Sequence, residues 1–414
     1  MNLAARLVLI ASAGAGAAAG AAGCAPGRGD DVLIWHAYDG AERRALEEVV
    51  DGWNQAHPER GARLVAVPYD AFADKLTSAI PNGNGPDLFI YNQDRLGDWA
   101  RSGTIEPIGF WVDAAVADRF VTRASGGDAG SDPLAALVEG DQLYGLPLAV
   151  KSLALFYRTD QVPVPPRTTD DLLAMADTRR AAGQGGYPMA YASADLYGHA
   201  PWLHGFGGRV LADDGSLAIA TPAATAAAEL ARTFIDRRVA PAEAEPALVA
   251  SLFNQGMAAM AVSGPWFVGD IAAGVPWAVT TLPIISATGQ PAAPFLGAEA
   301  VLMSSHAVDK AAAYAVMDHL AGDASATIRA RRGRQIVPNP AAYADPELAA
   351  DPVLAAFRAQ LATTVAMPSA PAMRLVWTPY KTALADILGH RAEAGARLWA
   401  AQQEIEGYLR GARR

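Results

Sequence analysis

Short apolar runs alternate with amphipathic segments over the first part of the chain. The runs at residues 32–35, 63–67 and 87–91 have the length of buried strands. Between them, apolar residues recur at helical spacing, as Leu46, Val49, Val50 and Trp53 in the first interval and as Phe72, Leu76 and Ile80 in the second. This strand–helix–strand alternation predicts an α/β fold, in which a parallel sheet is covered by helices on both faces.

The same alternation returns from residue 153 onward and predicts a second α/β lobe. Strands are expected at 153–157, 188–192, 257–262 and 277–282, and helices at 169–182 and 223–237. From residue 310 the chain is expected to be mostly helical, with its last helices near 380–390 and 395–410. This C-terminal third is expected to pack on one or both lobes.

Polar and aromatic residues follow two of the strands expected in the first lobe. Asp39 follows the first strand, and Tyr91, Asn92 and Asp94 lie at the end of the third. Ligands of α/β sheets bind at the carboxyl ends of the strands. We therefore expect both groups of residues to meet at the ligand-binding edge of the sheet.

The first residues have the composition of an export signal. Arg6 is the only charge among the first 27 residues, and residues 7–22 are almost all Leu, Val, Ile, Ala and Gly. A charge, an apolar stretch and small residues, in this order, predict a secretory signal at residues 1–23. The segment Ala21-Ala22-Gly23-Cys24 resembles a lipobox, so we expect lipidation of Cys24 and a linker over residues 24–31. The alternative is a plain signal peptide that is cleaved nearby.

Composition narrows the classes of function. The chain has 414 residues, enough for two or three domains, and its net charge of −10 argues against nucleic-acid binding. Cys24 is the only cysteine, which excludes an intramolecular disulfide. His199 and His204 are five residues apart, a spacing that does not place them on one helical face, so we expect no metal site. The sequence contains no glycine-rich phosphate loop and no nucleophile elbow, and we expect no cofactor.

Aromatic residues near turns, accompanied by carboxylates, are typical of a sugar-binding site. Trp266 follows Gly264-Pro265 at the end of an expected strand, and Trp377 stands just before an expected helix. Each tryptophan has the alternative of a core position, which we expect for the following three: Trp35, Trp53 and Trp399. The carboxylates also leave open a glycoside-cleaving enzyme, whose candidate acids are Asp39, Asp94 and Asp195.

Five segments in the same order resemble the maltose-binding protein family, whose members deliver sugars to ABC importers. The segments are residues 85–97, 146–150, 253–260, 263–266 and 367–377. The resemblance runs along nearly all of the chain after Trp35. It implies a periplasmic-binding-protein-like fold, with two lobes, a hinge and a central ligand cleft.

The resemblance also implies where the lobes begin and end. The N-terminal lobe would comprise residues 31–149 and 301–346, and the C-terminal lobe residues 154–295 and 353–414. The hinge would comprise residues 150–153, 296–300 and 347–352.

Alignment with the family's motifs implies a set of sugar-binding residues. The residues expected to bind hydroxyl groups, or to lie beside those that do, are Asp39, Tyr91, Asp94, Arg95, Asp195 and Tyr197. Trp266 and Trp377 match the two tryptophans that stack on sugar rings. The sequence departs from the family at Gly40, where a lysine is usual, at Arg158, where Asn or Asp is usual, and at Lys151, where the maltose binder has an acidic hinge residue. For Lys151 we keep two interpretations open, a hinge salt bridge and a ligand contact.

The function implied is that of an exported, monomeric binding lipoprotein without enzymatic activity, held in the periplasm or at the cell surface by the lipid on Cys24. It would capture maltose or maltodextrin-type oligosaccharides and pass them to the permease subunits of an ABC importer. The alternatives are a receptor for another sugar such as trehalose, a receptor for a different small solute, an exported glycoside-active enzyme, and a sensory partner of a membrane receptor.

Overall fold

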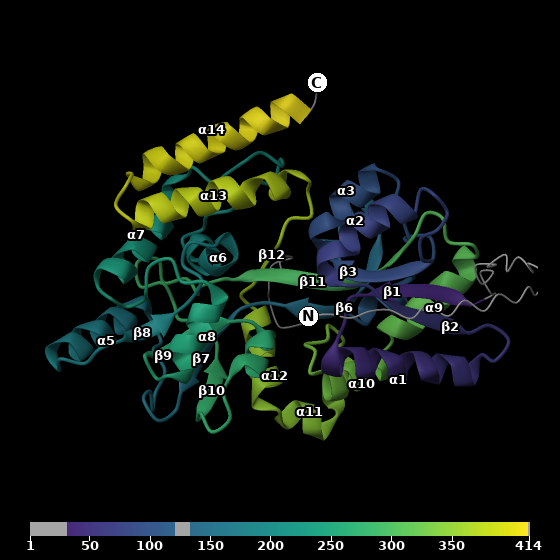
Figure 1. The fold of residues 1–414 in the computed structure, drawn as a ribbon, viewed down its shortest axis with the longest axis horizontal. Coiled ribbons are helices and arrows are strands. Elements are labelled where there is room, and N and C mark those ends of the chain that lie inside the picture. The colour runs from purple at the N-terminus through teal and green to yellow at the C-terminus, as the bar shows by residue number, and fades with distance from the viewer. Residues whose placement is uncertain (1–30, 121–132, 413–414) are drawn as a thin grey trace, which may run out of the picture.

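The computed structural model describes residues 31–120 and 133–412, and the expected signal sequence and Cys24 lie outside them. The described chain forms two α/β lobes side by side (Figure 1). One lobe is built on a six-stranded sheet and the other on a four-stranded sheet. The two α/β lobes expected from the sequence are confirmed.

The sheet of the first lobe is mixed. Its order is β12-β11-β3-β1-β2, and β6 also pairs with β11. Strand β1 is parallel to β2 and β3, as predicted, whereas β11 is antiparallel to β3 and β6, which the sequence did not predict. The strands are β1 (Val32–His36), β2 (Ala62–Ala66), β3 (Leu88–Asn92), β6 (Gly145–Lys151), β11 (Phe295–Met303) and β12 (Val365–Ala366).

Helices cover both faces of this sheet. Ile34, Leu88 and Val301 point to one core together with Leu46 of α1 and Val316 of α9. The alternate strand residues point to a second core, which includes side chains of α2 and α3. The elements around the sheet are α1 (Gly40–Ala56), α2 (Tyr69–Ala79), η1 (Gln93–Arg95), α3 (Leu96–Arg101), α4 (Ala114–Asp118), η3 (Ala135–Leu137), β4 (Val138–Glu139), β5 (Gln142–Leu143), α9 (Lys310–Ala321) and α10 (Asp323–Gly333).

The sheet of the second lobe has the order β10-β7-β9-β8. Strands β8 and β9 are parallel, and β7 is antiparallel to β9 and β10. The strands are β7 (Ala154–Arg158), β8 (Tyr187–Ala190), β9 (Ala258–Ser263) and β10 (Trp277–Thr280). The helices are α5 (Thr169–Ala181), α6 (Leu196–Gly205), α7 (Pro222–Asp236), α8 (Pro246–Asn254), α12 (Pro352–Leu361), α13 (Ala372–Leu388) and α14 (Ala394–Ala412), with η4 (Pro265–Asp270) after β9.

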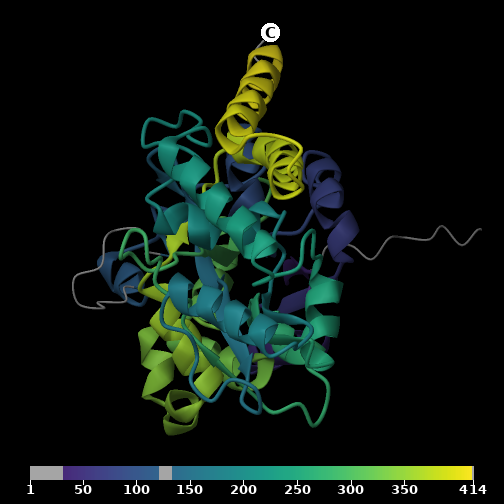
Figure 2. The same cartoon turned by 90° about the vertical axis from the view of Figure 1, so that its left-hand side faces the viewer.

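Two long strands and a shared core join the lobes. Strand β6 continues through Ser152 into β7, and the Ser152 hydroxyl donates a hydrogen bond to the carbonyl of Phe295 at the start of β11 (3.0 Å). A core cluster beside this junction contains residues of both lobes, for example Ala326 of α10 in the first lobe and Phe253 of α8 in the second. After α10 the chain passes from the first lobe to the second through η5 (Pro340–Ala344) and α11 (Pro346–Ala350). These two elements lie beside the shared core, at the opposite end of the molecule from α13 and α14 (Figure 2).

Two expectations for the C-terminal helices were wrong. Helix α13 begins at Ala372, so Trp377 and Pro379 lie inside it rather than before it. The helix continues through Pro379 because Val376, Tyr380 and Leu384 on the same helix are buried against the second-lobe core. Trp399 is 60% exposed, since α14 packs through Leu398 and Ile405 on its other face. Trp35 and Trp53 are buried as expected.

No helix in the described parts of the chain has both the length and the apolar character needed to cross a membrane.

Candidate functional site

The first-lobe candidates lie at one edge of the six-stranded sheet. Because β1 and β3 are neighbouring parallel strands, the residues that follow them emerge at the same edge. Asp39 stands at the N-cap of α1 but accepts no capping hydrogen bond through its side chain, and it is exposed. Asp94 and Arg95 occupy η1, directly after β3. The structure therefore places Asp39, Asp94 and Arg95 at the edge where the sequence predicted a ligand.

Asp94 has an unused hydrogen-bond acceptor. Its Oδ1 atom is buried and has no hydrogen-bond partner among the described residues. Burial raises the pKa of this carboxyl, while the positive charges of Arg95 and of Arg374 in α13 oppose that rise. A buried carboxylate oxygen without a partner is costly unless a donor such as a ligand hydroxyl satisfies it.

Tyr91, at the same edge, is buried rather than exposed to a ligand. Its ring is buried between Phe72, at a centroid distance of 5.3 Å, and Tyr69, at 5.5 Å. Burial raises the pKa of Tyr91, and the neighbouring Tyr69 raises it further. Tyr91 is thus a packed member of an aromatic stack, of which Tyr69 is the exposed end.

Lys151 lies at the end of β6, where the two lobes join. Its Nζ atom is 3.3 Å from Glu299 Oε1 in β11, and its side chain is 34% exposed. The charge of Glu299 raises the pKa of Lys151. The Tyr38 hydroxyl donates to the other oxygen of Glu299 (2.7 Å). Of the two interpretations of Lys151, the structure shows the salt bridge, with Glu299 as its partner.

The second-lobe candidates gather around the start of α6. Asp195 caps this helix, because its Oδ1 accepts a hydrogen bond from the backbone N–H of Tyr197 (2.8 Å). The ring centroid of Tyr197 is 6.4 Å from that of Trp266 and 6.2 Å from that of Phe295. Burial raises the pKa of Tyr197, and Asp195 adds to this rise. Tyr197 therefore stays a neutral hydrogen-bonding group.

Trp266 is 48% exposed and depends on the glycine before it. A Cβ atom on Gly264 would lie 2.2 Å from the six-membered ring of the Trp266 indole. Only glycine therefore lets the indole lie across the backbone at this turn. Gly264 thus leaves room for a half-exposed aromatic plane at this turn.

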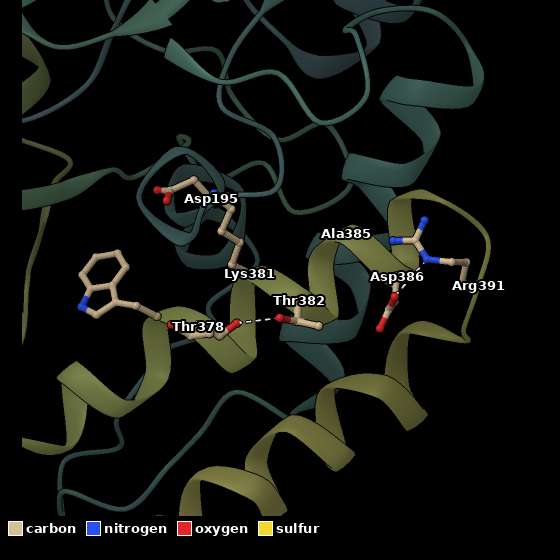
Figure 3. A pocket seen from close by; sticks show the side chains of 8 residues that line it. Asp195, Thr378, Lys381, Thr382, Ala385, Asp386 and Arg391 are labelled. Carbon is tan, nitrogen blue, oxygen red and sulfur yellow. Dashed lines mark hydrogen bonds and ion pairs between the residues drawn. The ribbon is translucent and has the colours of Figure 1, made fainter. Parts of the chain in front are cut away.

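Trp377 lines a cavity of about 360 Å³ on the second lobe. The other lining residues are Asp195, the segment of α13 that follows Trp377, and Arg391 just after that helix (Figure 3). Trp377 and Asp195, which lie far apart in the sequence, thus share the wall of one cavity.

The beginning of α13 joins the second-lobe group to the first lobe. Arg374, three residues before Trp377, forms an ion pair with Asp98 of α3. A Cβ atom on Gly97 would lie 2.6 Å from the carbonyl oxygen of Ser369, so this glycine permits the close approach of the two lobes. The first turn of α13, which precedes Trp377, therefore contacts the first lobe beside η1, and the charge of Arg374 acts on Asp94.

Sequence analysis missed Tyr69. This residue begins α2 and is 52% exposed, and its ring lies nearly parallel to Tyr91 (9° between planes). Asn92 donates a hydrogen bond to its hydroxyl (3.1 Å). Tyr69 follows β2, so extending the carboxyl-edge argument from the first and third strands to the second would have found it.

Two histidines that the sequence analysis considered as metal ligands, His199 and His204, are buried in the second lobe. Burial lowers the pKa of His199 and of His204 to about 3, so both are neutral. His204 Nδ1 lies 2.7 Å from the carbonyl oxygen of Ala293. Within the described part of the chain, no three His, Cys, Asp or Glu side chains are grouped so that they could hold a metal ion.

Several characterised proteins resemble this chain along most of its length. The maltotriose-binding protein of Pyrococcus abyssi is 25% identical over 92% of this chain and 83% of its own. The galactooligosaccharide-binding protein of Bacillus subtilis is 22% identical over 92% of this chain and 90% of its own. A maltooligosaccharide ABC transporter solute-binding lipoprotein of Streptococcus pneumoniae is 25% identical over 84% of this chain and 82% of its own.

Solved structures show the same fold. A cyclo/maltodextrin-binding protein complexed with maltotetraose superposes with a TM-score of 0.82 and 26% identity, over 93% of this chain and 99% of that one. The resemblance to the maltose-binding protein family that the sequence motifs indicated is thereby confirmed. The family model for bacterial extracellular solute-binding proteins matches residues 39–327. The chain therefore belongs to the family of bacterial extracellular solute-binding proteins.

Proposed function

We propose that this protein binds maltose or maltodextrin-type oligosaccharides between its lobes and delivers them to an ABC importer. The observation that carries the proposal is that Trp377 shares a cavity with Asp195 in the second lobe, while Arg374, three residues before it, pairs with Asp98 of the first lobe and acts on the charge of Asp94. The Oδ1 atom of Asp94 has no partner among the described residues. The names of the relatives from Pyrococcus abyssi and Streptococcus pneumoniae support the same ligand class.

The chemistry of a sugar suits these side chains. The C–H faces of a sugar ring are apolar and pack on aromatic planes such as those of Trp266 and Trp377. The hydroxyl groups on its rim bind charged partners, for which we propose Asp39, Asp94, Arg95 and Asp195. Each hydrogen bond to a charged group contributes about 1.5–3 kcal/mol, and a micromolar affinity corresponds to roughly −8 kcal/mol. A few such bonds and two stacked rings therefore suffice after the costs of binding.

The proposed binding step is a closure of the two lobes by hinge bending. We place the hinge at residues 150–153, 296–300 and 347–352, between lobes formed by residues 31–149 with 301–346 and by residues 154–295 with 353–414. The ligand favours the closed form because its contacts with both lobes exist together only there. Lys151 lies at this hinge, where its ion pair with Glu299 leaves a third of the side chain exposed for a further ligand contact.

The proposed place of action is outside the cytoplasmic membrane. The proposed signal at residues 1–23 would direct the protein to export, and lipidation of Cys24 would attach it to a membrane. One acyl chain gives marginal membrane binding, whereas two or more hold a protein stably. The closed, monomeric receptor would dock on the permease subunits of the importer.

Tryptophan fluorescence and calorimetry test the ligand assignment. We expect purified protein to bind maltotriose, and Trp377→Ala to weaken binding roughly tenfold or more, which corresponds to about 1.4 kcal/mol. Trp399→Ala is the matched control, because Trp399 is exposed on the outer helix α14. Failure of wild-type protein to bind maltose and maltotriose would refute the maltodextrin assignment.

The same preparation distinguishes the alternatives. A thermal-shift screen with trehalose, galacto-oligosaccharides and other small solutes identifies a different ligand, because a ligand stabilises the state it binds. Galacto-oligosaccharides are included in the screen because the relative from Bacillus subtilis is a galactooligosaccharide-binding protein. Shortened products after incubation with maltodextrins would instead show a glycoside-active enzyme.

A further inference from the structure

Glu299 is a buried carboxylate at the junction of the two lobes. It lies in β11 and is 8% exposed. One of its oxygens accepts a hydrogen bond from the Tyr38 hydroxyl (2.7 Å), and the other lies 3.3 Å from the Nζ atom of Lys151. A buried carboxylate is costly unless it is both paired and hydrogen-bonded, and Glu299 meets both conditions.

A second positive charge, that of Arg329 in α10, acts on the same group. Arg329 is fully buried, and its guanidinium donates to the carbonyls of Leu148 in β6 (3.0 Å) and Leu320 in α9. Burial lowers the pKa of Arg329 to about 10, while Tyr38 and Glu299 oppose this fall. The guanidinium therefore stays charged and attracts the Glu299 carboxylate from within the first lobe.

Lys151 connects this buried group to the ligand-binding edge of the sheet. The Lys151 side chain is 34% exposed, whereas that of Glu299 is 10% exposed. The charge of Glu299 raises the pKa of Lys151, and Glu42 of α1 and Tyr69 of α2 add to the rise. Both helices begin at the edge for which we propose a sugar ligand, so the ammonium of Lys151 lies on that side.

Glu299 restricts where this ammonium can lie. A lysine ammonium sits on a flexible four-carbon stem, and ordering such a side chain lowers the affinity for a ligand. Strands β6 and β11 pair antiparallel, with Lys151 opposite Gly297 and Ala149 opposite Glu299. Because both side chains belong to paired strands of the proposed hinge, their ion pair would persist when the lobes close.

We propose that Glu299 is a positioning residue for ligand binding, which holds the ammonium of Lys151 so that it donates to a sugar hydroxyl. This inference rests on the proposed sugar-binding function and deepens it. Tyr38 and Arg329 would keep the Glu299 carboxylate in place. A lysine ammonium has three N–H donors, so the contact with Glu299 leaves two for the ligand.

Nuclear magnetic resonance tests the contact without a ligand. The lysines of the chain are Lys75, Lys151, Lys310 and Lys381, so dimethylation with isotope-labelled methyl groups gives few signals. The signal that is missing in Lys151→Met belongs to Lys151. We expect the pKa of Lys151 to fall in Glu299→Gln, because the charge that raises it is removed. An unchanged pKa would overturn the proposal.

A double-mutant cycle tests the role in binding. Calorimetry with maltotriose compares the wild type with Glu299→Gln, Lys151→Met and the double variant. We expect Lys151→Met to weaken binding roughly tenfold, as the loss of one hydrogen bond to a charged group does, and Glu299→Gln to weaken it by a smaller factor. The double variant should bind as Lys151→Met does. A merely structural role of Glu299 would instead add its own loss when Lys151 is absent.

The matched control is Glu106→Gln, which breaks another Lys–Glu pair. Glu106 lies 2.8 Å from Lys310, with side chains 24% and 38% exposed, and its backbone N–H donates to Met303 at the far end of β11. This variant should bind maltotriose as the wild type does.

The possible failures are distinct. A gain or no change of affinity in Glu299→Gln, or an equal loss with and without Lys151, would overturn the positioning role alone. Absence of binding of maltose and maltotriose to the wild type would overturn the proposed function, and the role of Glu299 with it.

Discussion

At the scale of single residues, the side chains best suited to contact a ligand are those with an unpartnered polar atom or an exposed aromatic ring. Asp94 has a buried oxygen without a partner among the described residues. Tyr69 has one face covered by Tyr91 and half of its surface exposed. Trp266 lies across Gly264, where a side chain would displace the indole from its present position. The unpartnered oxygen of Asp94 has a cost in the free protein that a hydroxyl donor of a ligand would remove.

Tyr69→Ala tests whether the aromatic stack of the first lobe takes part in binding. Because the Tyr69 ring is held by Tyr91, a sugar face can pack on it with little loss of side-chain entropy. We expect a loss of affinity of about 1 kcal/mol, or roughly fivefold, measured by calorimetry with maltotriose.

Tyr408→Ala provides the control for this measurement. Tyr408 is also 52% exposed, and its hydroxyl donates to Glu404 (2.9 Å) on the outer helix α14. Equal affinities of Tyr69→Ala and Tyr408→Ala for maltotriose would show that Tyr69 does not contact the ligand.

At the scale of elements, helix α6 connects the site to the core of the second lobe. Its N-terminus carries Asp195 and Tyr197, and its later turns bury His199 and His204. Both ring nitrogens of His199 lack partners among the described residues. The element that positions two of the proposed ligand contacts is therefore sensitive to protonation of its buried side chains.

The sign of this pH dependence follows from the pKa values. Burial lowers the pKa of His199 from 6.5 to about 3, so the folded state keeps the ring neutral while the unfolded state takes up a proton below pH 6.5. The stability from this histidine is present above pH 6.5 and is lost as the pH falls toward 3. Between pH 7 and pH 5 the free energy of unfolding should fall by about 2 kcal/mol for His199 alone.

Urea denaturation at pH 7 and pH 5 measures this difference. We expect the loss between the two values to be smaller in His199→Gln, whose side chain does not titrate, than in the wild type. The exposed His306 gives the control variant His306→Gln, which should behave as the wild type. An unchanged loss in His199→Gln would show that this histidine does not cause the pH dependence.

At the scale of the whole molecule, α13 adds a further contact between the lobes to the strands and the shared core that join them. It packs on α14 and α7 of the second lobe, and its first turn reaches α3 of the first lobe. Arg374 both pairs with Asp98 and opposes the rise in the pKa of Asp94. The contact between the lobes therefore lies beside the proposed ligand carboxylate.

Asp98→Asn should weaken the contact between the lobes without unfolding either one. Partly exposed ion pairs contribute up to about 1 kcal/mol, so we expect at most a fivefold loss of affinity for maltotriose. Small-angle scattering of the ligand-free variant should show a larger radius of gyration, because a contact that favours this arrangement is lost.

The control for this variant is Asp160→Asn, which removes an ion pair with Arg158 inside the second lobe. If Asp98→Asn matched Asp160→Asn in both affinity and radius of gyration, the ion pair would have no part in closure.

The sequence by itself determined the elements whose signal is local. Helical spacing identified α1 and α2, and short apolar runs identified β1, β2 and β3 with their parallel order. Position after a strand then placed Asp39 and Asp94 at one edge. These inferences succeeded because an element that buries one face must repeat its apolar residues at the period of its backbone.

Only the tertiary structure decided which distant segments meet. Strand β11 is buried along its whole length, so no alternation in its sequence indicates its antiparallel partners β3 and β6. The pairing of Lys151 with Glu299 joins residues 148 positions apart. The start of α13, the exposure of Trp399 and the cavity that Trp377 lines depend in the same way on which face of a helix packs against a neighbouring element. Such contacts form between surfaces that only the complete fold brings together, and the local pattern of the chain does not specify them.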